Sequence, residues 1–178
     1  EALAEAFRAA PIEFDSVAEY ELRRYVPRLA PTSPAPGGGG LLQSEALATI
    51  ESYLPTDGHI VLDAGNCASA AIHMTRVPRG SSSTIALGGG GMGYAFAAAV
   101  GAQLGSPVGS RTVALCGDGA FLINGLEIHT AVDLGLPILF VVFNNQMHGM
   151  CATRQQLYFD SRFECVSYAP LDVLQVSR

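Results

Sequence analysis

Lysine is absent from this sequence of 178 residues, and all ten basic residues are arginine. Without lysine the chain cannot form a lysine Schiff base, and it lacks the lysine of a typical P-loop nucleotide-binding site. Charged residues make up only 15% of the chain, and the formal net charge is −6. This acidic balance argues against nucleic acid or an anionic membrane surface as a partner.

Long apolar runs and paired cysteine motifs are also missing. The longest apolar run, residues 137–143, is far too short to cross a membrane, and no secretory signal peptide is visible. No two of the four cysteines are spaced C-x-x-C, so the sequence gives no support to a zinc or iron–sulfur site. We expect all four to be small buried residues in a reducing compartment, and the protein to be cytoplasmic.

The composition divides the chain into three parts. Residues 30–40, APTSPAPGGGG, have the composition of a linker, because proline stiffens the chain while glycine opposes helix and strand. Residues 1–29 are then the end of a preceding (middle) domain. Residues 41–178 form the main domain, which we expect to be truncated at its C-terminus.

Predicted helices and strands alternate along the main domain. Ser44 is a candidate N-cap for the first helix, whose apolar face carries Leu47, Ile50 and Leu54. This alternation predicts an α/β fold in which a parallel sheet is covered by helices on both faces. The predicted helices cover residues 44–54, 66–74, 92–104 and 125–134, and the predicted strands cover residues 59–63, 84–87, 112–116 and 138–143.

Glycine-rich or polar clusters come directly after each predicted strand. Parallel α/β sheets bind ligands at the carboxyl ends of their strands, so these clusters are expected to converge on one edge of the sheet. The clusters are Gly65 with Asn66, residues 88–92, residues 117–119 and residues 144–149.

Asp118 and Asn145 stand out because each follows a buried strand. If those strands are neighbours, one carboxylate and one amide oxygen lie close together. That is too few ligands for calcium but suits Mg²⁺, which keeps water and takes further ligands from phosphate oxygens. Gly117 and Gly119 let the backbone approach a diphosphate, and Gly119 and Ala120 offer N–H groups at a helix start.

The order GDG (117–119), then 24 residues, then NN (144–145) resembles the signature of enzymes that use thiamine diphosphate. The stretch GDGAFLINGLEIHTAVDLGLPILFVVFNNQMHGM resembles the acetolactate synthase and 2-oxo acid decarboxylase family, and the resemblance covers roughly residues 41–170. It implies a thiamine-diphosphate-binding fold. It also implies that Mg²⁺ is held by the Asp118 carboxylate, the Asn145 side chain and the Met147 backbone carbonyl. The diphosphate neighbours that it implies are Asn66, Gly117, Gly119, Ala120, Asn145, His148 and Gly149.

The segment GGGGMGYAFAAAVGAQ (88–103) is similar to the family's segment that grips the aminopyrimidine of the cofactor. The resemblance implies that the Gly90 carbonyl binds the 4′-amino group and that Met92 is the apolar wedge that folds the cofactor. Both are therefore candidate catalytic residues. Ordinary core packing is an equally weighted alternative for Met92. Gly88, Gly90 and Gly93 also fit G-x-G-x-x-G, a dinucleotide motif, but no acidic residue follows at the required distance.

Cys151 marks a departure from one branch of the family. Simple aldehyde-releasing decarboxylases have a glutamate six residues after the second asparagine, where this chain has Cys151. The resemblance therefore implies an acetolactate-synthase-like carboligase, a transferase or lyase that decarboxylates one 2-oxo acid and joins the product to a second carbonyl compound. The activating glutamate that the family requires has no match here, which implies a pyrimidine-binding domain from the same or a neighbouring chain.

Several alternatives remain open at this stage. The chain could belong to another thiamine-diphosphate-dependent 2-oxo acid decarboxylase or a dehydrogenase subunit, or to a non-catalytic regulatory subunit of the same fold. A Rossmann nucleotide binder is a further class. We expect a homo-oligomer, either a dimer or a tetramer. FAD in another domain is possible in this family but is not indicated by these residues.

Overall fold

The computed structural model describes residues 40–177. The predicted end of a preceding domain (residues 1–29) and all but the last residue of the predicted linker lie outside the described residues. Within the described part, the expected α/β architecture is confirmed, since four strands alternate with helices. The strands are β1 (His59–Leu62), β2 (Ser82–Ile85), β3 (Thr112–Gly117) and β4 (Ile138–Phe143).

The sheet is entirely parallel, with strand order β2-β1-β3-β4. From β1 the chain moves outward to β2, then crosses back to β3 and continues to β4 on the other side. The order therefore reverses between β1 and β3, and ligands of such sheets bind beside this point, at the carboxyl ends of the strands. The last pair of the β3–β4 register is Gly117 with Phe143, so Asp118 and Asn144 leave the sheet side by side.

Helices cover both faces of the sheet, as the alternation predicts. Side chains of β1 and β3 alternate between two buried clusters, one on each face. One cluster packs against α2 (Gln43–Glu51) and α3 (Asn66–Met74), and the other against α4 (Tyr94–Leu104) and α5 (Asp118–Asn124). The second face also carries η1 (Gly125–Glu127), α6 (Ile128–Asp133) and α8 (Val173–Val176).

The start of the first helix differs from the prediction. Ser44 is not the N-cap; α2 begins at Gln43 and its N-cap is Leu42. The Leu42 N–H donates to Glu45 Oε2 at 3.2 Å, so a carboxylate one turn into the helix satisfies the end instead. The predicted end of this helix is also wrong, since α2 stops at Glu51 and Leu54 lies beyond it. Leu47 and Leu54 are nevertheless buried in one cluster, and Ile50 packs against it.

Other predicted boundaries are also shifted, those of β1 and β3 by one residue at their ends. The second strand covers Ser82–Ile85 rather than 84–87, and α4 begins at Tyr94 rather than Met92. The predicted helix 125–134 divides into a 3-10 turn and the short α6, preceded by the separate α5. The separate α5 ends before Gly125, where a Cβ would lie only 2.5 Å from the Phe121 ring one turn earlier, so the packing of that ring excludes a side chain at this position.

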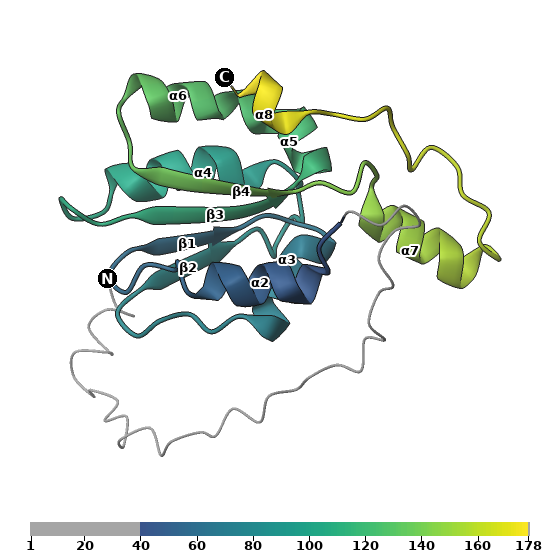
Figure 1. The fold of residues 1–178 in the computed structure, drawn as a ribbon, viewed down its shortest axis with the longest axis horizontal. Coiled ribbons are helices and arrows are strands. Elements are labelled where there is room, and N and C mark those ends of the chain that lie inside the picture. The colour runs from purple at the N-terminus through teal and green to yellow at the C-terminus, as the bar shows by residue number, and fades with distance from the viewer. Residues whose placement is uncertain (1–39, 178) are drawn as a thin grey trace, which may run out of the picture.

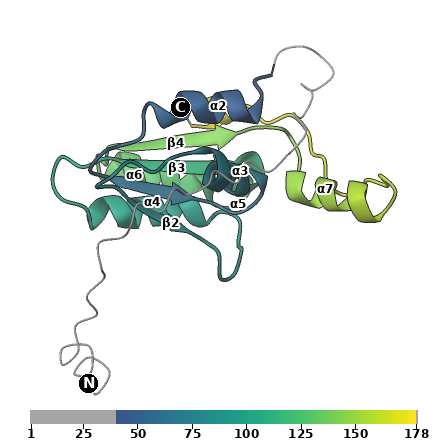
Figure 2. The same ribbon diagram turned by 90° about the horizontal axis from the view of Figure 1, so that it is seen from below.

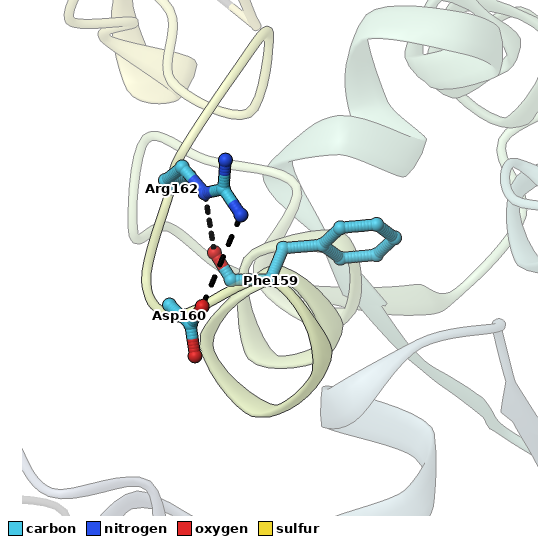
Figure 3. A network of polar contacts seen from close by, with 3 residues as sticks. All are labelled: Phe159, Asp160 and Arg162. Atoms are coloured by element: carbon cyan, nitrogen blue, oxygen red, sulfur yellow. Dashed lines mark hydrogen bonds and ion pairs between the residues drawn. The ribbon is translucent and has the colours of Figure 1, made fainter.

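Helix α7 (Gly149–Tyr158) stands beyond the tips of the strands, away from the sheet and the helices that cover it (Figures 1 and 2). None of its residues is buried. The turn that ends it is drawn in Figure 3, where Arg162 meets Asp160 at 3.9 Å and its Nε donates to the Phe159 carbonyl at 3.3 Å. Asp160 and Ser161 both have positive φ, which reverses the chain toward the sheet.

Only two of the four cysteines behave as the sequence predicts. Cys67 and Cys116 are buried, whereas Cys151 and Cys165 are exposed, so the expectation of four buried thiols is wrong for the second pair. The reason is local: Cys151 lies on the outlying α7, and Cys165 lies in the exposed chain after it with φ of 54°. No helix in residues 40–177 is long and apolar enough to cross a membrane.

Candidate functional site

Asp118 is a buried carboxylate at the tip of β3. It is 3% exposed, and its two oxygens accept three backbone hydrogen bonds. Oδ1 accepts from the Gly119 N–H at 2.9 Å. Oδ2 accepts from the N–H groups of Asn145 and Gln146, at 3.1 and 2.5 Å, and both belong to the loop that follows β4. Charge-assisted bonds of this kind stabilise a buried negative charge and join the tips of two neighbouring strands.

The loop after β4 is shaped by its own two asparagines. Asn145 Oδ1 accepts from the Met147 N–H at 3.2 Å, which folds the side chain over the turn, where Gln146 has φ of 58°. Asn144 instead bonds to a residue far along the chain, since its Nδ2 donates to the Leu171 carbonyl at 2.9 Å. The loop that presents Asn145 and Met147 is thus held by one bond within the turn and by one bond to a distant segment.

Asn66, the first residue of α3 after β1, also approaches this loop. A Cβ built on Gly149 would lie 3.0 Å from Asn145 Nδ2 and 3.4 Å from Asn66 Nδ2, so both amides approach the glycine backbone closely. Asn66 Nδ2 also donates to Thr153 Oγ1 on α7 at 3.4 Å. A cavity of about 330 Å³ opens here, lined by Asn66, Asn145, Met147, Gly149, Ala152, Thr153, Gln156, Phe163, Val166 and Ser167.

Gly119 connects the glycine-rich segment with the loop after β4. A Cβ at Gly119 would lie 3.0 Å from His148 Nδ1 and 3.9 Å from Met92 Sδ. Met92 is 40% exposed, so ordinary burial in the core of this chain does not explain it. Ala120 is 1% exposed and its side chain packs in the core, so only its backbone can face a ligand. Gly117 is the N-cap of α5.

Gly90 lies in the exposed turn that precedes Met92. Its φ of 60° is in the left-handed region, and its N–H donates to the Ala86 carbonyl at 3.0 Å. The sequence candidates from three strand tips therefore come together around Gly119 and Gly149, while Gly90 stands in the turn beside them.

Asp63 is a site residue that sequence reasoning missed. It is fully buried at the tip of β1 and accepts from the Gly93 N–H at 2.9 Å and the Ala95 N–H at 2.7 Å, besides the neighbouring Ala64 N–H at 2.8 Å. It thereby caps the start of α4 from another strand and fixes the end of the glycine-rich segment. The signal was available, because an acidic residue at the end of a buried strand is the same pattern that singled out Asp118.

Tyr168 was also missed, and it lies beside Asp118. Burial raises the pKa of its phenol above the ordinary value, and the nearby Asp118 carboxylate raises it further. The buried hydroxyl nevertheless makes no hydrogen bond of acceptable geometry with any described residue, so the two groups are close neighbours rather than a bonded pair. No sequence periodicity marks this tyrosine, which reaches the site only through the course of the chain after α7.

The donors at this site fit a magnesium ion held partly by a ligand. Residues 40–177 contain no group of three or more histidine, cysteine or acidic side chains that could hold a metal by themselves. Asp118 brings one carboxylate, and the loop brings amide and backbone oxygens, all of which are hard donors. Such a set needs phosphate oxygens and water to complete the shell.

Residues 63–178 match the family described as "Thiamine pyrophosphate enzyme, C-terminal TPP binding domain". The chain belongs to this family. The resemblance predicted from the GDG and NN motifs is thereby confirmed, and so is a domain that binds thiamine diphosphate. The alternative of a Rossmann nucleotide binder finds no support in this match.

Curated relatives agree with the family. The chain is 33% identical over 134 residues to the acetolactate synthase large subunit of Parasynechococcus marenigrum (strain WH8102), covering 75% of this chain and 21% of the relative. It is 34% identical over 117 residues to the acetolactate synthase isozyme 2 large subunit of Escherichia coli (strain K12), covering 66% and 21%. It is 32% identical over 126 residues to the sulfoacetaldehyde acetyltransferase of Castellaniella defragrans, covering 71% and 21%. The chain thus spans about a fifth of the length of these relatives.

Proposed function

We propose that the complete protein is a thiamine-diphosphate-dependent carboligase, which decarboxylates a 2-oxo acid and joins the remaining fragment to a second carbonyl compound. The observation that carries the proposal is the buried Asp118 carboxylate, bonded to the loop that presents Asn145 and Met147, in a chain of this family. The names of the relatives support a synthase or transferase of this kind.

In this proposal Mg²⁺ is held by the Asp118 carboxylate, the Asn145 side-chain oxygen and the Met147 backbone carbonyl. Three backbone N–H groups hold Asp118 in place before any metal arrives, which lowers the cost of ordering the site. Asn145 Oδ1 accepts one hydrogen bond, from Met147, and an amide oxygen has a second lone pair for the metal.

The diphosphate would lie along the backbone of Gly117, Gly119 and Ala120, with polar atoms of Asn66, Asn145 and His148 around it and Gly149 below. Two features support this placement. A Cβ at Gly119 would crowd His148 and a Cβ at Gly149 would crowd Asn145, so these bare glycines let polar side chains gather close to the backbone of the GDG turn and of α7. The buried His148 Nδ1 has no partner among the described residues, and a phosphate oxygen would supply one.

The glycine-rich segment would hold the other end of the cofactor. When bound, thiamine diphosphate would supply a nucleophilic thiazolium carbon for addition to the 2-oxo acid, and its cationic ring would take up the electron pair left behind as CO₂ departs. We assign the Gly90 carbonyl to the 4′-amino group and the Met92 side chain to the wedge that keeps the cofactor folded. Its half-exposed position beside Gly119 suits Met92 to that task.

The choice of a carboligase over a simple decarboxylase rests on α7. Cys151 occupies the position at which the resemblance would require a glutamate to protonate the intermediate and release an aldehyde. A thiol is a poor replacement for that acid. The resulting site favours transfer to a second carbonyl compound, with pyruvate as the first substrate to test.

Partners follow from the same reasoning. The activating glutamate is assigned to a pyrimidine-binding domain of the same or a neighbouring chain, and we infer a homo-oligomer, a dimer or a tetramer, that brings the two domains together. A cytoplasmic location remains a prediction.

Calorimetric titration of the complete protein with thiamine diphosphate tests the site directly. The wild type should bind the cofactor only when Mg²⁺ is present, and Asp118→Ala should lose this Mg²⁺-dependent binding. Asp160→Asn is a matched control, because Asp160 is a carboxylate that is 96% exposed on the turn after α7. Equal binding by wild type and Asp118→Ala, with both proteins folded, would refute the metal site.

Product analysis tests the reaction. The complete enzyme should convert pyruvate, in the presence of thiamine diphosphate and Mg²⁺, into acetolactate with release of CO₂. Acetaldehyde as the main product would contradict the carboligase and favour a simple decarboxylase. Tight cofactor binding without turnover of any 2-oxo acid would favour a non-catalytic subunit.

A further inference from the structure

The chain after α7 folds back onto the site as a return segment, defined as residues 163–168. Its first anchor is the Gln155 side chain on α7, whose Nε2 donates to the Glu164 carbonyl at 3.0 Å. The Glu164 N–H donates in turn to Gln155 Oε1 at 2.8 Å. The Gln155 side-chain amide thus bonds to both the N–H and the carbonyl of Glu164, which fixes the direction of the return segment.

The second anchor is the loop after β4. The His148 N–H donates to the Val166 carbonyl at 2.7 Å, and the Tyr168 N–H donates to the Gln146 carbonyl at 3.3 Å. These bonds form a short antiparallel bridge centred on Met147. The return segment is therefore bonded along the same loop that presents the proposed metal ligands.

This bridge places two polar side-chain atoms without partners beside the GDG turn. The Tyr168 hydroxyl and His148 Nδ1 are both buried, and neither has a hydrogen-bond partner among the described residues. The two rings contact each other edge to face, with centroids 5.4 Å apart. His148 Nδ1 faces Gly119, and the hydroxyl lies next to Asp118. Buried polar atoms are rarely left unpaired, so two of them at one place indicate an acceptor that arrives with a ligand.

We propose that Tyr168 is a cofactor-binding residue whose phenol donates a hydrogen bond to an anionic oxygen of the diphosphate–metal unit, alongside His148. The inference rests on the proposed function, because it assumes that a diphosphate occupies this site. Tyr168 lies outside the GDG and NN motifs, 23 positions after Asn145 along the chain.

Asp118 does not supply the missing acceptor. Its Oδ2 already accepts two backbone N–H groups and its Oδ1 accepts a third, which leaves one lone-pair site for the metal. A phenol has an ordinary pKa of about 10, so it is protonated and remains a donor at neutral pH. The Tyr168 hydroxyl is thus a neutral donor beside Asp118, whose lone pairs are used by the backbone and the metal. A phosphate oxygen suits such a donor, because it is a strong acceptor that rotation of the hydroxyl can reach.

The test compares Tyr168→Phe with wild type in the complete protein, using two probes and one stability measurement. The probes are thiamine diphosphate and inorganic pyrophosphate, each titrated calorimetrically with Mg²⁺ present. The stability measurement is the melting midpoint of the cofactor-free protein. Tyr158→Phe is the matched control, because Tyr158 ends α7 and is 75% exposed.

We expect Tyr168→Phe to raise the Kd of both probes on the order of tenfold, as for the loss of one hydrogen bond to a charged acceptor. The cofactor-free variant should melt no lower than wild type, because the change removes a buried hydroxyl that had no partner. Tyr158→Phe should change neither quantity. This combination of weaker binding and undiminished stability is not produced by a merely structural tyrosine.

Three results would overturn the assignment. An unchanged Kd for pyrophosphate would show that the hydroxyl does not reach the diphosphate, even if the Kd for the whole cofactor rose. A lower melting midpoint without cofactor would make the residue structural. Weaker binding of both probes by Tyr158→Phe would trace the effect to α7. If the wild type bound neither probe, the proposed function itself would fail, which is a distinct outcome.

Discussion

Replacing Asp63 tests how the glycine-rich segment is held in place. The carboxylate is fully buried, and it accepts from the distant N–H groups of Gly93 and Ala95. A buried donor that loses its acceptor costs about 1–3 kcal/mol, so Asp63→Ala should destabilise this region by about 4 kcal/mol. Asp63→Asn keeps one acceptor oxygen and turns an N–H toward the second donor, which should cost about 2 kcal/mol.

Amide hydrogen exchange measures this effect locally in the complete protein. The amides of Gly93 and Ala95 should exchange about a thousandfold faster in Asp63→Ala and roughly thirtyfold faster in Asp63→Asn, since about 1.4 kcal/mol corresponds to a factor of ten. Amides in the middle of β3 should change far less, because they belong to the sheet rather than to the glycine-rich segment.

Asp57→Ala is the control, because Asp57 lies in the exposed turn before β1. It should leave the exchange of Gly93 and Ala95 as in wild type. Unchanged exchange at both amides in Asp63→Ala would refute the view that this carboxylate anchors the segment, and uniform loss of protection everywhere would refute its local role.

Three further predictions concern stability alone. Gly101→Ala should raise the free energy of unfolding by about 0.5–1 kcal/mol in denaturant titrations, since Gly101 lies inside α4 and a Cβ there meets nothing within 4 Å. Burial raises the pKa of the Cys67 thiol from 9.0 to about 11, so the folded state favours the protonated thiol. Stability should therefore fall as pH rises from 9.0 to about 11, and it should fall less in Cys67→Ala. Arg162→Ala should leave the melting midpoint unchanged, because its ion pair with Asp160 is exposed on both sides.

The sheet and the approach of Asp118 to the loop of Asn145 were predictable because the sequence marks them locally. The uninterrupted apolar run of β4 and the glycine after β3 fix where both strands end, and the parallel order then makes Asp118 and Asn145 neighbours. The bounds of α3 and β4 match the prediction. Gly65 stands before the start of α3, and Pro137 and Asn144 stand on either side of β4.

The contacts that were missed depend on chain far away in the sequence. Asp63 bonds to amides 30 and 32 positions later, and no local pattern reports such a pairing. Tyr168 reaches Asp118 only because α7 ends in a turn and Gln155 directs the return segment.

The most direct test of the metal site is a crystal structure of the complete protein with thiamine diphosphate and Mn²⁺ in place of Mg²⁺. Anomalous scattering would locate the ion. The proposal predicts a peak within coordination distance, roughly 2.0–2.2 Å, of an Asp118 carboxylate oxygen, Asn145 Oδ1 and the Met147 carbonyl, with diphosphate oxygens completing the shell. An ion bound elsewhere, or a diphosphate seated away from Gly119, would contradict it.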